Sequence, residues 1–331
     1  MVKITKHPDG PEFDCAEGDT ILRAALRAGV GMSYSCNVGS CGNCRFELIE
    51  GEVEHLRKDA PAWSERDLKR NRWLGCQAQP KGECRIKFRE DPGAISPDTP
   101  EHRTAELVSV TPVTHDISEF AFRVDGTDSY SPGQYALITA PGIEGGRAYS
   151  MSRLAGDGTW RFMIRKVPGG AATGHLFEAA KPGDTLSIDG PYGTGWLRED
   201  CPRDIVLIAG GSGLSPMVSI AEGAAAAGML GDRRLHFFYG CRTEDDLFNP
   251  EDILGAEIAG KTSFTAALSE PGSGWTGPTG FIHDVVRDTL GEAIAEAEIY
   301  FAGPAVMSAS IQKMAHEAGV PMDRLHFDEF Y

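Results

Sequence analysis

The spacing of hydrophobic positions changes character along the chain and divides it into three regions. In the first region, residues 45–54 alternate with period two as a strand and turn, and residues 19–29 follow the helical period and end at a glycine. From residue 104 to about 197, short alternating segments are separated by glycine and proline turns. Beyond residue 204, continuous apolar runs are each followed by a glycine and a helical stretch. We therefore expect a multidomain α+β protein.

The middle and last regions predict different sheets. Six short strands are expected at 105–110, 119–124, 133–139, 147–152, 161–167 and 184–190, a spacing that favours a small antiparallel β-barrel. The last region predicts a buried strand, a glycine turn and a helix over 204–228. Two further strand–turn units follow at 234–248 and 298–314. Alternating strands and helices imply an α/β domain with a parallel sheet.

Composition places the first boundary near residue 92. Residues 1–92 hold 15 basic and 15 acidic side chains, whereas residues 93–331 hold 17 and 33 and carry the whole formal charge of −16. The proline-rich stretch 91–102 is typical of a semi-rigid linker. We expect domains at 1–92, 103–198 and 199–331, joined by a linker at 93–102.

The acidic charge of residues 93–331 argues against a nucleic-acid partner, because phosphate contacts need clustered Lys and Arg.

The chain shows no stretch of 18 uncharged apolar residues and no basic start followed by an apolar run. We expect a cytoplasmic protein that is a monomer and has no membrane partner. Disulfides are rare in that compartment, so the eight cysteines are not expected to form a disulfide framework.

Four cysteines follow the spacing C-x4-C-x2-C…C of plant-type [2Fe–2S] sites. Gly39 and Gly42 fit such a loop, since they can adopt positive φ and turn backbone N–H groups toward sulfur. A structural zinc site would more usually show two Cys-x2-Cys pairs, and a catalytic cysteine would not need three companions. The other four cysteines lack this spacing and are expected to be inert. The expected cluster ligands are Cys36, Cys41, Cys44 and Cys76.

Two stretches of the middle region suggest a phosphate-bearing ligand with a flat ring. Arg147 and Tyr149 are expected on one face of a strand, where an arginine can bind a pyrophosphate and a tyrosine can stack on a ring. Residues 171–173 follow two glycines at an expected helix start, where exposed amides favour a phosphate. In the last region, the glycine turn at 210–213 lies between strand and helix, as a dinucleotide site requires.

The first region, from residue 2 to about 90, resembles plant-type ferredoxin domains of the β-grasp fold. The rest resembles the FAD- and NAD-binding domains of the ferredoxin–NADP reductase superfamily. Its Arg-x-Tyr-Ser motif falls on Arg147, Tyr149 and Ser150, and its Gly-x-x-Ser motif is Gly170-Ala-Ala-Thr173 here. A C-terminal aromatic often covers the flavin in this superfamily. The resemblance implies these FAD contacts: Arg147, Tyr149, Ser150, Ile164, Arg165, Lys166, Gly170, Ala171, Ala172, Thr173, and Phe330 or Tyr331.

The same resemblance places NAD on the last region. The superfamily's Gly-x-Gly-x-x-Pro turn matches residues 211–216. Its Tyr-Gly-x-Arg-x-x-x-Asp-Leu segment matches residues 239–247 and places Arg242 near the adenosine half. Where relatives commonly have Cys-Gly-Pro-Pro, this chain has no thiol, which puts the fine placement of the nicotinamide in doubt. The implied NAD contacts are Gly211, Ser212, Gly213, Pro216, Arg242, Ala302, Gly303 and Pro304.

The order ferredoxin, FAD domain, NAD domain resembles the reductase component of bacterial multicomponent oxygenases. The resemblance implies electron transfer from NADH to FAD, then to [2Fe–2S], then to a terminal oxygenase or its Rieske ferredoxin. No side chain need act as acid or base. Two alternatives stay open: a reductase for another acceptor, such as a deoxysugar-forming enzyme, and a non-enzymatic iron–sulfur sensor. Arg242, Arg233 or Arg234 could hold the 2′-phosphate of NADPH, although NADH is favoured.

A basic run at 66–72 lies just before the fourth expected ligand. It is either a solvated helix face without a partner or a surface that steers an acidic oxygenase toward the cluster.

Overall fold

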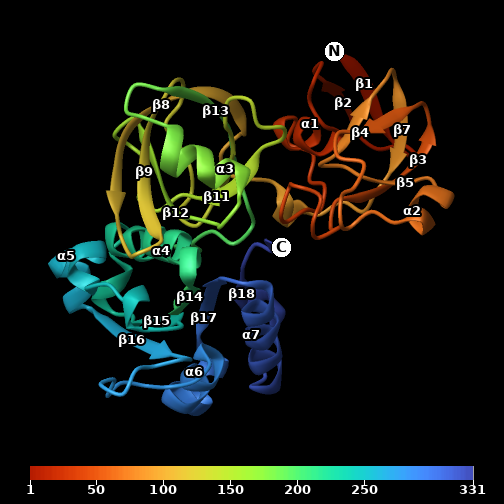
Figure 1. The fold of residues 1–331 in the computed structure, drawn as a ribbon. Coiled ribbons are helices and arrows are strands. Elements are labelled where there is room, and N and C mark those ends of the chain that lie inside the picture. The colour runs from red at the N-terminus through yellow and green to blue at the C-terminus, as the bar shows by residue number, and fades with distance from the viewer. Residues whose placement is uncertain (331) are drawn as a thin grey trace.

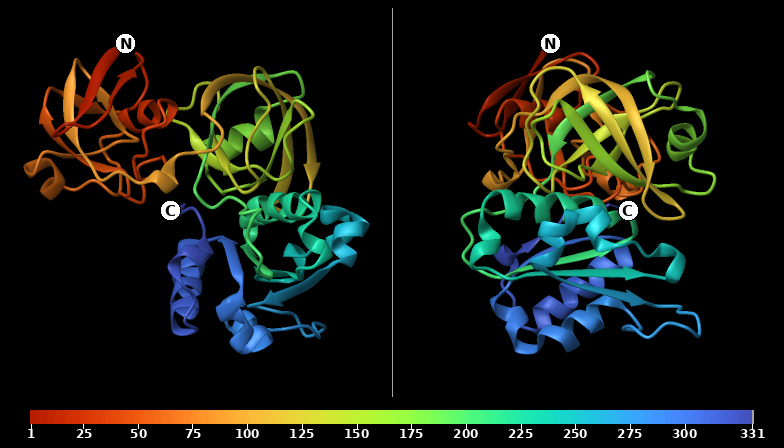
Figure 2. Two further views of the ribbon diagram at one scale, coloured as in Figure 1. Left: turned by 180° about the vertical axis from the view of Figure 1, so that it is seen from behind. Right: turned by 90° about the vertical axis from the view of Figure 1, so that its left-hand side faces the viewer.

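The computed structural model describes residues 1–330 and contains three domains, shown in Figure 1. The first domain (red to orange) lies beside the second (yellow to green), and the third (cyan to blue) lies below the second. The described C-terminal end lies where the three domains approach one another, and the view from behind in Figure 2 agrees. No helix among these residues combines the length and the apolar character that crossing a membrane requires.

The first domain is a mixed five-stranded sheet in the order β2-β1-β7-β3-β5, packed against one helix. Only β1 and β7 pair in parallel. Helix α1 buries five apolar side chains in this core, because they recur with the helical period. The expected capped helix is present, but the Thr20 side chain makes no capping hydrogen bond. The bounds are β1 Val2–Lys6, β2 Glu12–Cys15, α1 Ile21–Arg27, β3 Arg45–Glu50, β4 Val53–His55, α2 Glu65–Lys69, β5 Arg72–Leu74, β6 Ala78–Pro80 and β7 Cys84–Lys87.

The second domain is the expected antiparallel barrel, with strand order β11-β10-β13-β8-β9-β12. A bridge between Met151 and Phe162 brings the two outer strands together. The core holds fully buried Phe120, Phe122 and Trp160, which come from the alternating inward positions of β9 and β12. The bounds are β8 Glu101–Pro112, β9 Ile117–Val124, β10 Tyr135–Thr139, β11 Arg147–Ser150, β12 Thr159–Arg165, α3 Ala171–Gly174 and β13 Thr185–Tyr192.

The stretch between these domains packs against both of them. Ala94 is buried in the core of the first domain. The Gln134 side chain donates to Ser96 Oγ at 2.8 Å, and Ser131 donates to Asp98 at 3.3 Å, so the stretch is also fixed to the barrel. β8 begins at Glu101, inside the range expected for the linker. The stretch therefore holds the two domains together as well as spacing them.

The third domain has the expected parallel sheet, in the order β16-β15-β14-β17-β18. Helices α4 and α5 pack on one face and α6 and α7 on the other, as the right-hand view in Figure 2 shows. Two of its strands, β16 and β18, were not among the expected ones. The bounds are β14 Ile205–Gly210, α4 Leu214–Ala226, β15 Leu235–Cys241, α5 Pro250–Gly260, β16 Thr262–Leu268, α6 Ile282–Leu290, β17 Glu298–Ala302, α7 Ala305–Glu317 and β18 Leu325–His326.

Candidate functional site

The four expected cluster ligands lie together in the first domain as two interacting thiol pairs. Cys36 pairs with Cys41, and Cys44 pairs with Cys76. The hydrogen bond from the Cys41 thiol, helped by backbone N–H groups and opposed by burial, lowers the pKa of Cys36 to about 6. The corresponding contact with Cys44 lowers the pKa of Cys76. One thiol of each pair is therefore favoured as the thiolate that metal binding requires.

Residues 35–44, here called the cluster loop, wrap their backbone around the first sulfur. The N–H groups of Val38, Ser40 and Cys41 donate to Cys36 Sγ over 3.5, 3.3 and 3.4 Å. The turn depends on Gly39, whose φ is +87°; a Cβ there would also lie 3.1 Å from the Ala60 side chain. The loop is thus preorganised to bind and hydrogen-bond a thiolate.

The grouping of the four thiols in two pairs helps to decide whether they fit a single zinc ion or a [2Fe–2S] cluster. A single tetrahedral zinc would hold all four sulfurs within about 4 Å of one another, given Zn–S bonds near ~2.3 Å. Across residues 1–330 no three thiols lie within 4.8 Å of one another. Four thiols grouped as two pairs therefore fit a binuclear iron–sulfur cluster better than a single zinc ion.

A cavity of about 610 Å³, here called the FAD cavity, lies between the barrel, the third domain and the cluster loop. Arg147 lies on its wall, where its Nη1 donates to the carbonyls of Gly145 and Gly146 at 3.0 and 3.3 Å. Within the described chain, Arg147 Nε and Nη2 have no protein acceptor, so they are free to bind an anionic group. The expected FAD residues on the wall are Arg147, Tyr149, Ser150, Arg165, Gly170, Ala171, Ala172, Thr173 and Phe330.

The expected FAD residues Ile164 and Lys166 do not line this cavity, and the hydroxyl of Thr173, which does line it, is already hydrogen-bonded. Ile164 is fully buried in the barrel core, and the Lys166 side chain pairs with Glu178 at 2.9 Å. The Thr173 hydroxyl is engaged inside its own turn, where it accepts from the Val167 N–H at 3.2 Å. Tyr331 lies outside the described residues, so Phe330 is the aromatic that can be placed; its ring packs edge-on against Tyr135 at 5.1 Å.

A second cavity, of about 550 Å³ and here called the NAD cavity, opens at the carboxyl ends of β14, β15 and β17. The two cavities adjoin, because their walls share Arg165, Gly210, Gly211 and Pro304. A Cβ on Gly213 would lie 2.0 Å from the Ala302 carbonyl oxygen, which explains the glycine at this close approach. Each expected NAD residue lines one of the two cavities: Gly211, Ser212, Gly213, Pro216, Arg242, Ala302, Gly303 and Pro304.

Models of three protein families match the chain in the same order. Residues 4–81 match the 2Fe-2S iron-sulfur cluster binding domain, residues 104–196 the oxidoreductase FAD-binding domain, and residues 207–313 the oxidoreductase NAD-binding domain. The ferredoxin–NAD(P)(+) reductase CarAd of Metapseudomonas resinovorans is 39% identical over 96% of both chains. The chain belongs to the ferredoxin–NAD(P)(+) reductase components of oxygenase systems.

Other members of this family are similarly related to the chain. The reductase component of the Xanthobacter autotrophicus alkene monooxygenase system is 37% identical over 97% of this chain and 98% of the relative. The ferredoxin reductase in carbazole 1,9a-dioxygenase has 37% identity and a TM-score of 0.92, over 100% of this chain and 98% of that one. The Amycolatopsis cytochrome P450 reductase GcoB has 29% identity and a TM-score of 0.87, over 100% and 99%.

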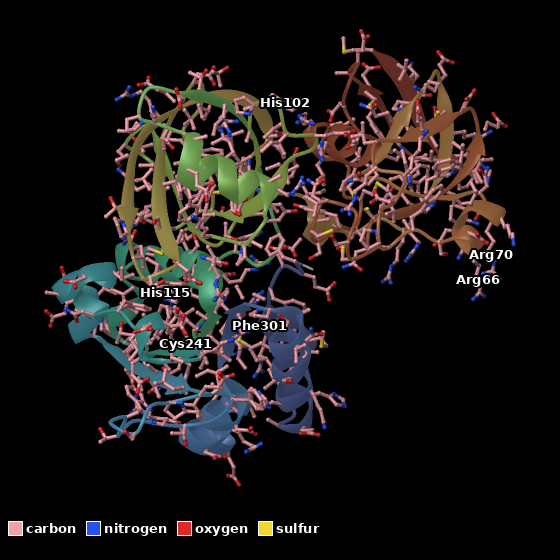
Figure 3. The ribbon with its side chains drawn as sticks, in the orientation of Figure 1. Arg66, Arg70, His102, His115, Cys241 and Phe301 are labelled. Carbon is pink, nitrogen blue, oxygen red and sulfur yellow. The ribbon has the colours of Figure 1, made fainter. Side chains whose placement is uncertain are left out.

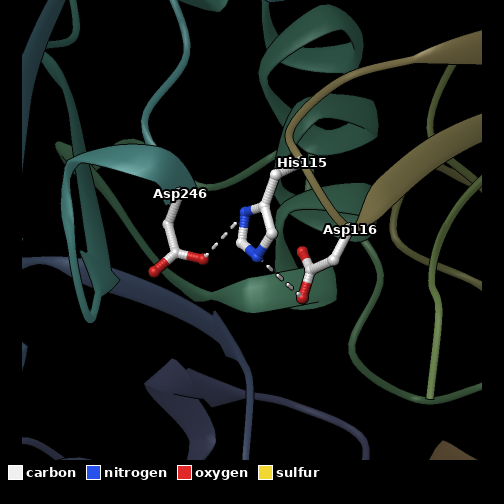
Figure 4. Close-up of side chains that lie close together, drawn as sticks. All are labelled: His115, Asp116 and Asp246. Carbon is white, nitrogen blue, oxygen red and sulfur yellow. Dashed lines mark ion pairs between the residues drawn. The ribbon is translucent and has the colours of Figure 1, made fainter. Parts of the chain in front are cut away.

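This reductase also has cavity residues that the sequence reasoning did not identify. Asp116, on the turn between β8 and β9, accepts from Arg165 Nε at 2.5 Å. Asp246 accepts the N–H groups of Arg242 and Thr243 at 3.0 and 3.1 Å. His115 lies between these two carboxylates, 3.7 Å from each, and joins the barrel to the NAD domain, as Figure 4 shows. Only Asp246 lay within a recognised motif, so only it had a sequence signal.

Two further residues of the NAD cavity wall were also missed. Phe281 is 67% exposed, which is unusual for a phenylalanine and leaves its ring open to a ligand. Cys241, expected to be inert, lies in this wall, and burial raises the pKa of its thiol to about 12. The thiol is therefore protonated at neutral pH and unreactive.

Proposed function

We propose that this reductase takes electrons from NADH and delivers them, through FAD and the [2Fe–2S] cluster, to a terminal oxygenase or its intermediary Rieske ferredoxin. One observation carries the proposal. Val38 of the cluster loop lines the same cavity as Arg147 and Tyr149, and that cavity adjoins the NAD cavity. The arrangement supports an enzyme over an iron–sulfur sensor, since a sensor has no need of two adjoining dinucleotide cavities.

The side chains of this chain bind and orient the cofactors and do not act as acids or bases. FAD held there would supply a two-electron acceptor for the hydride of NADH and a one-electron donor for the cluster. We assign the pyrophosphate to Arg147 and the flavin ring face to Tyr149. The amides at the start of α3 would bind a phosphate, and Phe330 would cover the cavity from the side of the C-terminal segment.

NADH is the proposed donor because a carboxylate lies beside Arg242. The 2′-phosphate of NADPH would add negative charge near Asp246, which accepts the Arg242 backbone N–H at 3.0 Å, and the other arginine of this wall, Arg165, is already paired with Asp116. Like charges at such a site disfavour binding. Comparing kcat/KM for the two nucleotides tests this assignment, and a tenfold preference for NADPH would overturn it.

The proposed partner docks where the cluster is nearest to solvent. Cys41 is the only one of the four ligands that is not fully buried. Helix α2 is linked to the loop that bears it, because Arg45 donates to the Gly42 carbonyl at 3.4 Å and pairs with Asp67 at 3.2 Å. Figure 3 shows Arg66 and Arg70 of this helix at the outer edge of the domain. These cations fit an acidic acceptor surface.

Substituting one ligand separates the two halves of the proposed electron path. Cys41→Ser should impair the cluster, because a hydroxyl is a poor substitute for a thiolate, while the other two domains keep their own cores. The variant should still convert NADH and two ferricyanide ions to NAD⁺, H⁺ and two ferrocyanide ions, since ferricyanide accepts electrons directly from flavin. Reduction of cytochrome c or the oxygenase should largely fail.

Ser40→Ala, next to the ligand, is the matched control and should leave both reactions in place. The assays are run together with iron and flavin analysis of each preparation. If both acceptors were reduced normally by an iron-depleted variant, the cluster would not lie on the path and the proposal would be wrong.

A further inference from the structure

The segment after β18 leaves the NAD domain and is anchored to the end of the barrel. The half-buried Asp328 carboxylate accepts the N–H groups of Thr194 and Gly195 at 3.0 and 3.3 Å. Residues 328–330, here called the C-terminal segment, are thereby held against the FAD domain, at the meeting point of the three domains in Figure 1. The next residue of this segment faces the first domain.

Glu329 joins the two ends of the cluster loop. Its N–H donates to Ser35 Oγ at 2.6 Å, and its Oε2 accepts from Asn43 Nδ2 at 3.2 Å. Ser35 directly precedes Cys36, and Asn43 directly precedes Cys44, so one residue contacts the neighbour of a ligand in each thiol pair. A shift of Glu329 would therefore move both halves of the metal site.

The same segment also reaches the FAD cavity. Phe330 lines that cavity together with Val38 of the cluster loop. Tyr135 links the two, because its hydroxyl donates to the Ser35 carbonyl and its ring packs against Phe330. The cavity wall, the C-terminal segment and the cluster loop thus form one contiguous set of contacts.

We propose that Glu329 is a positioning residue that holds the cluster loop against the FAD cavity. Electron transfer weakens steeply as donor and acceptor move apart, so the rate at which single electrons leave the cavity for the cluster depends on this contact. The inference rests on the proposed order of electron transfer. Glu329, which follows the last strand of the NAD domain, would thus affect electron transfer to the cluster, the step that comes after NADH oxidation.

The test compares Glu329→Ala, Glu329→Gln and Asn43→Ala as holoenzymes with matched iron and FAD content. Glu292→Ala, an exposed glutamate on the NAD domain, is the control. Hydrogen–deuterium exchange of residues 35–44 reports the loop directly and does not depend on turnover. Glu329→Ala and Asn43→Ala should raise this exchange about three- to tenfold, the range for one lost hydrogen bond. Glu329→Gln keeps an acceptor and should stay near wild type.

The second measurement is the ratio of cytochrome c reduction to ferricyanide reduction with NADH. It should fall several-fold in the two alanine variants, while the ferricyanide rate is kept. Unchanged loop exchange, an equal loss of both rates, or loss of iron from Glu329→Ala would each overturn the positioning role. A wild-type enzyme that failed to reduce either acceptor would instead contradict the proposed function, so the two failures are distinguishable.

Discussion

At the residue scale, the FAD cavity depends on a few side chains that have polar atoms without a hydrogen-bond partner in the described part of the protein. Arg147 shows this most plainly, because it lines the cavity and only one nitrogen of its guanidinium donates to the preceding loop among residues 1–330. A charged hydrogen bond to the FAD pyrophosphate is worth about 1.5–3 kcal/mol. Removing it should weaken FAD binding by roughly one to two decades.

Arg147→Ala should therefore purify with depleted FAD that excess flavin partly restores. Titration of the apoprotein with FAD, followed by flavin fluorescence, gives the change in Kd. Arg123→Ala is the matched control, since Arg123 lies on the same barrel and forms an exposed pair with Glu106. Full flavin occupancy in purified Arg147→Ala would show that the pyrophosphate binds elsewhere.

The sequence predicted candidate site residues where short motifs carry them and missed those that the fold brings together. The four cysteines could be predicted as ligands because a binuclear cluster constrains their spacing, and the structure brings them together as two pairs. Asp116 and Phe281 lie 165 positions apart and meet in one cavity wall only after the barrel and the parallel sheet have formed. Glu329 likewise had no local signal, because its partners are almost 300 residues away.

At the element scale, strands were predictable where alternation or a glycine turn marked them. Edge strands β16 and β18 were missed because they are only partly buried or very short, so their hydrophobic pattern is weak. Helix α2 has a clear start, since Ser64 and Asp67 form a reciprocal capping box. The polar pattern beyond that cap predicted an exposed helix face, and no residue of α2 is buried.

The exposed face of α2 leads to a prediction about docking. Cations at this surface should attract an acidic partner over long range and raise its association rate. Lys69→Glu/Arg70→Glu should slow reduction of the oxygenase roughly tenfold or more at low salt, with less effect at high salt. Stopped-flow rates over a salt series measure this, with ferricyanide as the acceptor that needs no docking. The four cations, which form no ion pair in residues 1–330, are Arg66, Lys69, Arg70 and Arg72.

Lys87→Glu/Arg89→Glu makes the same charge change at two exposed positions in and just after β7 and serves as the control. A general effect of net charge would slow both double variants alike. If the α2 variant reduced the oxygenase at the wild-type rate, the basic run would be an ordinary solvated face.

At the scale of the whole molecule, the ferredoxin and FAD domains are joined by a partly buried ion network. Arg27 of α1 pairs with Asp189 of β13 and with Asp19 of its own domain, at 2.5 Å in each case. The Tyr192 hydroxyl donates to the same Asp189 at 2.9 Å. Side chains of Tyr135 and Tyr192 extend the core of the first domain across the interface. Such an interface favours a ferredoxin domain that keeps a fixed position relative to the FAD domain over one that moves between two positions.

The final prediction tests whether this network holds the domains together. Arg27→Ala removes the nearest cation from two nearly buried carboxylates and leaves Asp189 with only the more distant Arg23, at 4.0 Å, and His102, at 3.6 Å. Breaking a buried pair in this way typically costs about 3–5 kcal/mol. We expect the ferredoxin domain to detach in part, so small-angle scattering should give a larger radius of gyration. Cytochrome c reduction should fall while ferricyanide reduction persists.

Adding Asp189→Asn to Arg27→Ala removes one of the stranded charges and should restore part of the compact form, as a double-mutant cycle would show. Arg57→Ala, which breaks an exposed pair of the same domain, should change the radius of gyration little. An unchanged radius in Arg27→Ala would mean that the other contacts of the first domain, such as those of Tyr135 and Glu329 with Ser35, fix the cluster beside the FAD cavity without this ion network.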